Sequence, residues 1–275
     1  MVNEALLPTE ADVQFYQDNG YWISDKVVSD DLLARMREHM DLVFDGKYET
    51  GKTPLPYWTS GVDDPKVVRK VDYAHWADRT IAELVLDETI GGIAARLAKT
   101  STIRLWHDQL LYKPGDSTAK GNVGWHQDYF YWQCAKPADL LTAWVALVDV
   151  DETNGCMQFV PGSHKWGLLD EDLDFFDNDR DAQLSRIKGP SGESAKVINV
   201  RLKAGQMSFH HCLLLHGSGP NLTDSPRRSL VIHMMPGHTR RQMGTKDDAH
   251  SNCKYFKGND GDLWTGEEFP VIYQE

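Results

Sequence analysis

The sequence predicts an α+β fold in which a double-stranded β-helix, a cupin-like jelly roll, is flanked by N-terminal helices. Three observations support this prediction. Helical spacing of apolar residues is concentrated in residues 1–100. Short strands separated by Gly-, Pro- and Asn-rich turns occupy residues 101–236, a pattern typical of sandwiches and barrels. A polar, irregular tail follows at 237–275, and we expect the three parts to form one domain, 1–275.

Two helices are predicted in the first 45 residues. Thr9 is suited to cap the first helix, with Asp12 at the third position, and Gly20 ends it. A short extended segment follows at 21–24, and Ser29 then caps the second helix. The apolar residues of the second helix that we expect to face the core are Leu32, Leu33, Met36, Met40, Val43 and Phe44.

Residues 46–76 are punctuated by Gly and Pro and are predicted as a long loop. A loop of this length is often functional, for instance as a lid, and the alternative is a plain surface connection. Residues 78–99 are helical again, and Gly91-Gly92 is predicted to bend or break this helix.

The strands of the predicted core begin at residue 102. Thr102–Lys113 is extended, and the nearly continuous apolar run Leu140–Val150 indicates an inner strand covered on both faces. Residues 168–194 are acidic and polar and are predicted as an excursion between strands. The remaining strands are expected at 157–160, 197–200, 206–215 and 227–235.

Composition excludes some classes of function. A formal net charge of −12 argues against binding to nucleic acid or anionic membranes, because both require a basic surface. The first residues have no basic n-region and no apolar h-region, so we expect no signal peptide, and no apolar run is long enough to predict a membrane span. Four widely spaced cysteines without a CxxC motif indicate reduced thiols and a cytoplasmic protein.

The chemistry of the sequence centres on Trp125–Trp132, where His126 and Asp128 lie among five aromatic residues. Side chains two apart on a strand share a face, so this pair could supply two ligands to one divalent metal. A distant histidine would complete a two-His-one-carboxylate triad, which leaves positions on Fe(II) open for substrates. The alternative is a hydrogen-bonded His–Asp pair without a metal.

Four histidines are candidates for the third ligand: His210, His211, His216 and His233. His216 is favoured because it ends an apolar run directly before a Gly-rich turn, and a strand end at a barrel mouth is accessible to metal and substrate. Farther along, Arg227 and Ser229 share one strand face with His233. Arg227 and Ser229 together are suited to bind a carboxylate. The alternative is that Arg227 forms an exposed salt bridge, which would stabilise the protein little.

The ordered set of His126-x-Asp128, then His216-Gly-Ser-Gly-Pro-Asn, then Arg227 eleven residues after His216, resembles the phytanoyl-CoA dioxygenase family of Fe(II)/2-oxoglutarate oxygenases. The intervening segments LTAWVALVDV and NGCMQFVPGSHKWG are also similar to that family and occur in the same order. So is the opening helix followed by GYWIS, and the resemblance covers roughly residues 10–240.

The resemblance implies a role for each matched residue. His126, Asp128 and His216 would hold the iron, and Arg227 would bind the distal carboxylate of 2-oxoglutarate. Further residues implied at the co-substrate site are Ser218, Ser229, Gln109 and Trp144. For Trp144 the alternative is a core aromatic in an inner strand.

The resemblance also implies a reaction. 2-Oxoglutarate and O₂ would be co-substrates, ascorbate would stimulate turnover, and the products would be succinate, CO₂ and a hydroxylated small molecule. Relatives that halogenate have a small residue in place of Asp128, so the carboxylate here argues for hydroxylation. Desaturation, epoxidation or rearrangement would use the same residues.

The substrate is expected beside the His-x-Asp segment, lined by Tyr129, Tyr131, Trp132 and His233, with packing as the alternative for each. No basic patch suited to the phosphates of coenzyme A is evident, which favours a small metabolite or natural-product intermediate from secondary metabolism. Two rival functions use the same fold. One is a Zn- or Mn-dependent hydrolase or isomerase, but such an enzyme has no need of Arg227. The other is a non-catalytic binding module, but such a module has no need of an intact metal-binding triad.

Overall fold

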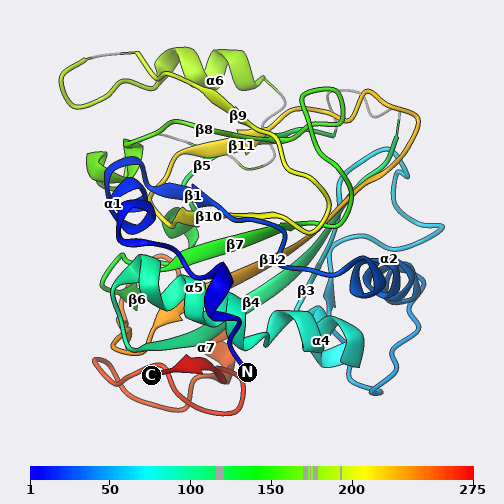
Figure 1. Cartoon of the computed structure of the whole chain (residues 1–275), viewed down its shortest axis with the longest axis horizontal. Coiled ribbons are helices and arrows are strands. Elements are labelled where there is room, and N and C mark those ends of the chain that lie inside the picture. The colour runs from blue at the N-terminus through cyan, green and yellow to red at the C-terminus, as the bar shows by residue number, and fades with distance from the viewer. Residues whose placement is uncertain (116–120, 170–172, 174, 176–178, 193) are drawn as a thin grey trace.

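The computed structural model describes residues 1–115, 121–169, 173, 175, 179–192 and 194–275 (Figure 1). Two antiparallel sheets face each other. The larger has the strand order β1 (Tyr21–Ile23), β10 (Met207–His211), β7 (Leu141–Ala146), β12 (Arg227–Pro236), β4 (Thr102–Lys113), β3 (Arg69–Asp72) and β2 (Leu55–Pro56), with β14 (Val271–Gln274) beside β4. The smaller has the order β5 (Val123–His126), β11 (His216–Ser218), β8 (Met157–Phe159) and β9 (Ile198–Val200). A separate pair joins β13 (Arg240–Arg241) to β6 (Ala135–Lys136).

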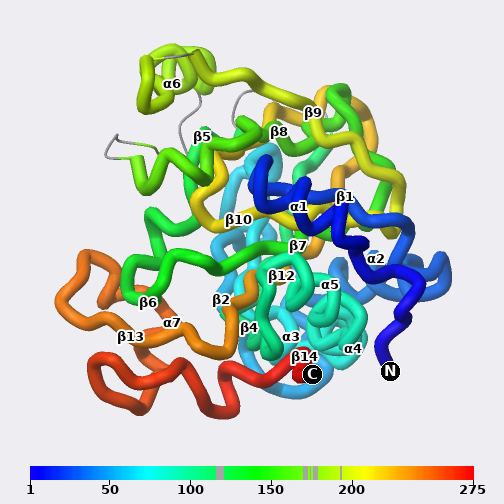
Figure 2. The backbone as a smooth tube through the Cα atoms, turned by 60° about the vertical axis from the view of Figure 1, so that its left-hand side comes forward, coloured from blue at the N-terminus to red at the C-terminus, as the bar shows by residue number. Residues whose placement is uncertain are grey.

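The helices lie mainly on the outer side of the larger sheet (Figure 1). Within the N-terminal part they are η1 (Glu4–Leu6), α1 (Glu10–Asn19), α2 (Asp30–Phe44), α3 (Ala74–Ala77), α4 (Arg79–Val85) and α5 (Glu88–Ala98). Later in the chain are η3 (Asp128–Tyr131), η4 (Ser163–Trp166), α6 (Arg180–Arg186) and α7 (Ser251–Tyr255). Figure 2 shows α6 at one end of the molecule, over the smaller sheet, and the C-terminal tail at the opposite end, beside β6 and α7.

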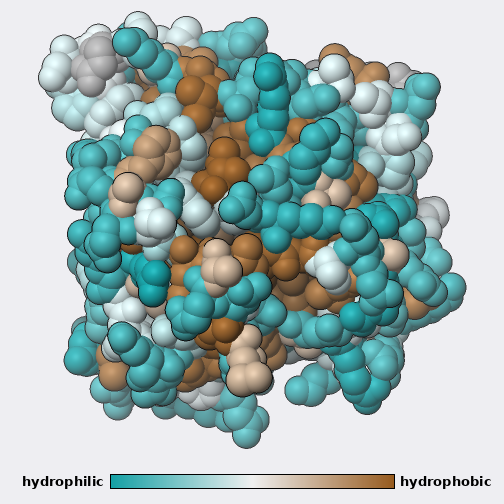
Figure 3. Space-filling model, viewed as in Figure 1, coloured by the Kyte–Doolittle hydropathy of each residue, from teal (hydrophilic) through white to brown (hydrophobic). Residues whose placement is uncertain are grey.

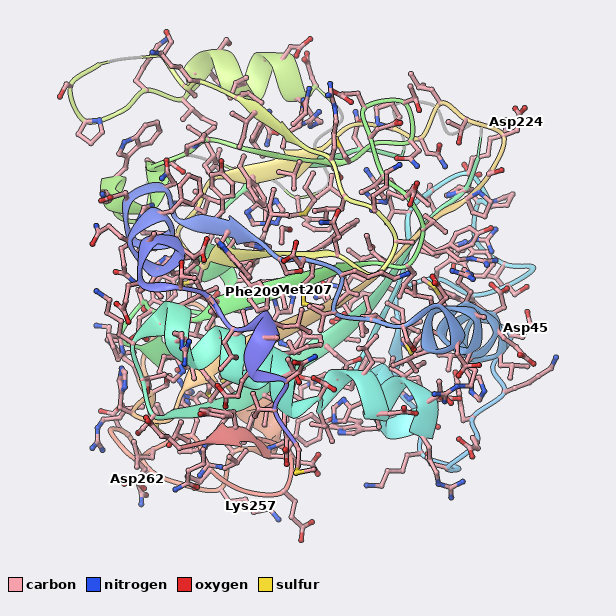
Figure 4. The ribbon with its side chains drawn as sticks, in the orientation of Figure 1. Asp45, Met207, Phe209, Asp224, Lys257 and Asp262 are labelled. Carbon is pink, nitrogen blue, oxygen red and sulfur yellow. The ribbon has the colours of Figure 1, made fainter. Side chains whose placement is uncertain are left out.

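Alternation along β10 illustrates how the layers are built. Met207 and Phe209, labelled in Figure 4, pack into the hydrophobic core between the larger sheet and the helices. His210, on the opposite face of the strand, lines a cavity between the two sheets. A buried side chain of this size contributes about 1.5–3 kcal/mol, so the helix-facing residues stabilise the sheet while the other face remains available for polar groups.

The predicted helix starts are confirmed. Thr9 and Asp12 form a capping box at α1, and Gly20 ends that helix in the left-handed conformation. Ser29 caps α2 by accepting a hydrogen bond from the Leu32 N–H. These local signals act over three or four residues, which is why they can be recognised without knowledge of the fold.

The predicted break at Gly91-Gly92 is wrong. The helical region divides earlier, where Asp87 caps α5 through the N–H groups of Thr89 and Ile90. At Gly91 an added Cβ would lie 2.7 Å from Ile272 Cγ2 and 2.8 Å from Tyr273 Cβ. The glycine therefore allows β14 to pack closely on α5.

Three further predictions need correction. The segment 46–76 is not loop throughout, because it contains β2 and β3, and β3 pairs with β4. The strand predicted at 206–215 ends at His211 as β10 of the larger sheet, and the turn at 212–215 leads into β11 of the smaller sheet, which begins at His216. The tail, predicted as irregular, contains α7 and β14, and α6 adds a helix within the predicted excursion. Residues 116–120, between β4 and β5, and residues 170–172, 174, 176–178 and 193, within the predicted excursion, lie outside the described residues.

The face seen in Figure 3 has hydrophilic side chains around its rim and hydrophobic side chains gathered toward its centre. Among the described residues no helix is both long and apolar enough to span a bilayer. All four cysteines are free thiols.

Candidate metal and co-substrate site

A cavity between the two sheets contains most of the residues that the sequence singled out. The larger sheet contributes Gln109, Leu111, Trp144, His210, Arg227, Val231 and His233 to its lining. The smaller sheet contributes Val123, His126, Met157, His216, Gly217 and Ser218, and Asp128 and Phe175 complete it. The strand alternation predicted for Arg227 and His233 is therefore confirmed, because both point to the same interior.

His126 and His216 lie opposite each other in the β5–β11 register, with ring centroids 4.1 Å apart. His126 Nδ1 lies 2.8 Å from the Gly124 carbonyl oxygen, and His216 Nδ1 lies 2.9 Å from that of Leu214. A carbonyl only accepts hydrogen bonds, so each Nδ1 carries the hydrogen and Nε2 keeps its lone pair in the neutral ring. Burial and the neighbouring His126 lower the pKa of His216 well below its ordinary value, which favours the neutral, ligand-competent form.

Asp128 reaches the same point by a route that the sequence did not predict. Strand β5 ends at His126, and Asp128 opens the 3-10 turn η3, so the two residues do not share a strand face. Their side chains still converge, because Asp128 Oδ1 lies 3.5 Å from His126 Nε2 and 3.6 Å from His216 Nε2. One potential ligand atom from each of the three residues lies within 4.8 Å of the others.

The other carboxylate oxygen of Asp128 is held by the protein. Oδ2 accepts a hydrogen bond from Thr142 Oγ1 at 3.0 Å and lies 3.3 Å from His210 Nε2. Oδ1 is thereby left for a ligand. Burial opposes ionisation of Asp128, but the nearby histidines, His216 foremost, hold its pKa well below the usual range. Two imidazole lone pairs and one free carboxylate oxygen are a donor set that suits non-haem Fe(II).

The remaining histidine candidates do not join this donor set. His210 Nε2 faces Asp128 Oδ2, so it supports the carboxylate. His233 Nδ1 lies 2.7 Å from Thr142 Oγ1, whose own hydrogen goes to Asp128. His211 uses Nδ1 to accept the Leu213 N–H, and it is not among the described residues that line this cavity.

Arg227 is 1% exposed in the same cavity. Nη1 donates to the Gly155 carbonyl at 2.5 Å, the guanidinium carbon lies 5.2 Å from the Trp144 ring, and Nε has no partner. Among the described residues no carboxylate forms an ion pair with it. Burial lowers the pKa of Arg227 only to about 10, so it stays charged at neutral pH. An unpaired buried cation is costly, which indicates an anionic ligand.

The other predicted co-substrate residues separate into two groups. Ser218, Gln109 and Trp144 line the cavity. Trp144 also packs in a core cluster, as its alternative interpretation expects, and its role toward the co-substrate stays a prediction. Ser229 is buried, but its hydroxyl donates to the Leu111 carbonyl at 3.4 Å, and it does not line the cavity in the described region.

A second cavity of about 400 Å³ opens beside the first and shares Asp128 and His233 with it. Tyr131 and Trp132 line it as predicted. Tyr129 does not: it packs in a core cluster and its hydroxyl donates to the Ala135 carbonyl at 2.9 Å, so the packing alternative describes it. The segment 46–76 does reach this cavity, through Leu55, Tyr57, Lys70 and Asp72.

The sequence interpretation missed several polar residues that line these cavities or contact the residues that do. Lys113 and His107 share the Gln109 face of β4, so the period-two pattern of a strand was a usable signal. Thr142 lies two residues before Trp144 on β7, so the same period-two pattern could have identified it from the sequence. His250 of the tail gave no signal, because only the fold of the whole chain brings it to the second cavity.

Residues 16–229 match the model of the family described as phytanoyl-CoA dioxygenase (PhyH). The chain belongs to the phytanoyl-CoA dioxygenase family. The family predicted from the sequence is thus confirmed. The bovine peroxisomal phytanoyl-CoA dioxygenase is 26% identical over 248 residues, which cover 88% of this chain and 68% of that protein. The rat enzyme is matched over 66% of its length, so the chain spans about two thirds of these relatives.

Other relatives of this PhyH-family chain act on different molecules. An ectoine dioxygenase from Streptomyces avermitilis is 27% identical over 236 residues, 82% of this chain and 77% of that one. The solved structure of the epimerase SnoN with Fe³⁺, alpha ketoglutarate and nogalamycin RO has a TM-score of 0.73 and 27% identity, covering 96% of this chain and 98% of SnoN. The carbocyclase SnoK, also from nogalamycin biosynthesis, has a TM-score of 0.73 and 28% identity, covering 96% of each chain.

Proposed function

We propose that this PhyH-family chain is an Fe(II)/2-oxoglutarate-dependent dioxygenase in which His126, Asp128 and His216 bind the iron. The observation that carries the assignment is the convergence of two imidazole Nε2 atoms and one free carboxylate oxygen in a buried cavity. Family membership and the iron and alpha ketoglutarate in the SnoN structure support the same cofactors here. A Zn- or Mn-dependent hydrolase and a non-catalytic module are not favoured.

Arg227 is proposed to bind the distal carboxylate of 2-oxoglutarate. Its unpaired Nε and the absence of a carboxylate partner among the described residues support this role. Ser218, Trp144 and Gln109 complete the co-substrate surface. Ser229 is not proposed to bind the co-substrate, because its hydroxyl donates to a backbone carbonyl.

Bound iron, with 2-oxoglutarate and O₂, would supply the oxidative decarboxylation to succinate and CO₂ and the oxidation of a substrate C–H bond. The protein's part is positioning. Thr142 and His210 orient Asp128, backbone carbonyls orient the two ligand imidazoles, and Arg227 orients the co-substrate. Aromatic walls, Trp132 and Phe175 among them, limit the access of water to the reacting centre.

The two facing sheets are proposed to be the two halves of a double-stranded β-helix within a single oxygenase domain, 1–275. Likeness to SnoN over 96% of the chain supports this assignment. The likeness to ectoine dioxygenase EctD, at 20% identity and a TM-score of 0.66, adds support for the fold alone. A cytoplasmic location stays a prediction, which the free cysteines accommodate.

We propose a natural-product intermediate or another small metabolite as substrate. The second cavity, at about 400 Å³, has the size typical of small-molecule sites. Of its two lysines, Lys70 lies 3.4 Å from Asp72, so it is already paired with an anion. The nogalamycin compound bound to SnoN supports a natural product over a coenzyme A ester.

Hydroxylation is the proposed outcome, and a second outcome has specific support. SnoN is an epimerase and SnoK a carbocyclase, and both match this chain over nearly its whole length. Hydrogen abstraction followed by ring closure would use the same ligands. So would abstraction followed by return of a hydrogen to the opposite face, for which an external reductant such as ascorbate supplies the two remaining electrons. Product mass separates the three outcomes: hydroxylation adds one oxygen, epimerisation keeps the composition, and ring closure removes two hydrogens.

The test is an anaerobic titration of the purified protein with Fe(II) and 2-oxoglutarate. We expect a weak visible charge-transfer band, which His126→Ala abolishes. Its absence from the wild type would overturn the proposal. Arg227→Met should raise the Kd for 2-oxoglutarate about a hundredfold, since it removes a buried charge-assisted contact. Arg228→Met is the matched control, because Arg228 pairs with Asp41 at 2.8 Å on the opposite strand face.

A further inference from the structure

Lys113 is a fully buried lysine that the proposed function leaves unused. It ends β4, directly opposite Arg227 in the β4–β12 register. Its Nζ extends to the smaller sheet, where it donates to Ser218 Oγ at 2.7 Å, to the Ser218 carbonyl at 3.3 Å and to the Gly219 carbonyl. The side chain therefore joins the two sheets beside the proposed co-substrate site.

These three acceptors suit the protonated form of the amine. An ammonium group has three N–H donors and no acceptor, so three surrounding oxygens match it fully. No carboxylate among the described residues forms an ion pair with Lys113. Burial, and then the Arg227 guanidinium, lower the pKa of Lys113 well below its ordinary value, and a carboxylate bound nearby would oppose that shift.

The contact with Lys113 also determines what Ser218 can do. Because its oxygen accepts from the ammonium, the hydroxyl keeps its own hydrogen for another partner. No acceptor among the described residues takes that hydrogen. Ser218 lines the same cavity as Arg227, so the hydroxyl is available as a donor to a ligand there.

We propose that Lys113 is a positioning residue for the co-substrate: it orients the Ser218 hydroxyl as a donor to the distal carboxylate of 2-oxoglutarate and adds a second buried positive charge beside Arg227. The inference rests on the proposed function. Two buried cations without a protein anion make this end of the cavity favourable for a carboxylate and unfavourable for a methyl group. Lys113 is therefore expected to set the preference for a dicarboxylate over a monocarboxylate 2-oxo acid.

The experiment compares 2-oxoglutarate with 2-oxopentanoate, which has a methyl group in place of the distal carboxylate. Both are titrated anaerobically into the Fe(II)-loaded protein, and the Kd of each is read from the charge-transfer band. The variants are Lys113→Met, Lys113→Gln, which keeps N–H donors without the charge, and Ser218→Ala. Lys165→Met, a change at an exposed lysine paired with Asp18, controls for the loss of one positive charge.

We expect Lys113→Met and Lys113→Gln to reduce the preference for 2-oxoglutarate about tenfold, the effect of one charge-assisted contact. Ser218→Ala should lower it by a smaller factor, and Lys165→Met should leave it unchanged. A purely structural role for Lys113 would weaken both ligands equally and keep their ratio. An unchanged ratio in both Lys113 variants would overturn this inference while the proposed function stands. A wild type that binds neither acid would instead overturn the proposed function.

Discussion

The two oxygens of the Asp128 carboxylate have different environments, and this difference determines how the residue can act. Oδ2 accepts from Thr142 and faces His210, while Oδ1 faces the Nε2 atoms of His126 and His216. The arrangement favours a ligand that binds through one oxygen. Substitution of a residue that supports a metal ligand in this way commonly weakens metal binding by about 10–100-fold.

Thr142→Val is therefore expected to weaken Fe(II) binding about tenfold or more, because it removes the donor to Asp128 at nearly constant volume. Thr142→Ser, which restores the hydroxyl, should recover most of the affinity. The measurement is anaerobic metal titration followed by calorimetry, with Co(II) as a second probe. Thr239→Val serves as control, since Thr239 is also buried but its hydroxyl has no partner and it lies outside both cavities as described. Equal affinities in the two valine variants would contradict the role of Thr142.

Asp72 lines the second cavity and is only 4% exposed. Burial raises its pKa from 3.8 to about 6, although Lys70 at 3.4 Å opposes the shift. The folded state thus holds a proton that the unfolded state releases between these two values. Stability consequently falls as the pH rises from about 4 to 6, and the cost is complete above 6.

Asp72→Asn should remove that cost. We expect a gain in the free energy of unfolding of up to about 3 kcal/mol at pH 8, shrinking as the pH is lowered through 6 toward 4. Denaturant unfolding across this range is the measurement. Asp45→Asn, at an exposed residue after α2 (Figure 4), should show no such pH-dependent gain. A gain that is the same at every pH would contradict the argument.

At the level of elements, local signals predicted the helix starts correctly. They failed where contact with a segment distant in sequence determines the local structure. The capping box at Thr9 was recognisable because its hydrogen bonds span three residues. The glycine pair in α5 was misread as a helix break, because its partner is β14, about 180 residues away in sequence. Likewise, Asp128 belongs to η3 and not to the strand. Strand alternation therefore predicted correctly that Asp128 lies near His126, but for a reason that does not apply.

Gly91→Ala tests the packing of α5 on β14. Alanine has a higher helix propensity by about 1 kcal/mol, yet its Cβ would meet Ile272 and Tyr273 within 2.8 Å. We expect a net destabilisation of about 1–3 kcal/mol, measured by denaturant unfolding. Gly92→Ala is a matched control on the same helix, since the nearest atom to its Cβ would be Leu7 Cδ2 at 3.3 Å. A stabilised Gly91→Ala variant would show that β14 can move away at little cost.

For the molecule as a whole, the predictable and unpredictable parts of the site have different origins. His126, His216 and Arg227 lie on strands of the two sheets, where period-two alternation and motif spacing are visible in the sequence. The end of β10 at His211 and the turn before β11 were not visible, because the apolar run continues through residues 212–215. The second cavity takes part of its wall from β2, β3 and the tail, which no local pattern connects, and it shares Gln109, His126, Asp128 and His233 with the first cavity.

We therefore predict that a change in the part of the tail that lines the second cavity can leave the binding of iron and 2-oxoglutarate unchanged. Asn252 holds α7 in place: it is fully buried, and its amide donates to the Trp106 carbonyl at 2.7 Å and accepts from the Tyr73 hydroxyl. Asn252→Ala should lower the free energy of unfolding by about 1–3 kcal/mol and speed hydrogen exchange of α7, through local opening. The Kd for 2-oxoglutarate should stay within about twofold, because His126, His216 and Arg227 lie on the two sheets.

Asn259→Ala, at an exposed asparagine whose side-chain amide donates to Asp262 nearby, should change neither quantity. The comparison is decisive in one direction. If Asn252→Ala raised the Kd for 2-oxoglutarate as strongly as it speeds exchange in α7, the tail would belong to the co-substrate site itself. The assignment of chemistry to the facing strands of the two sheets, and of substrate selection to β2, β3 and the tail, would then be wrong.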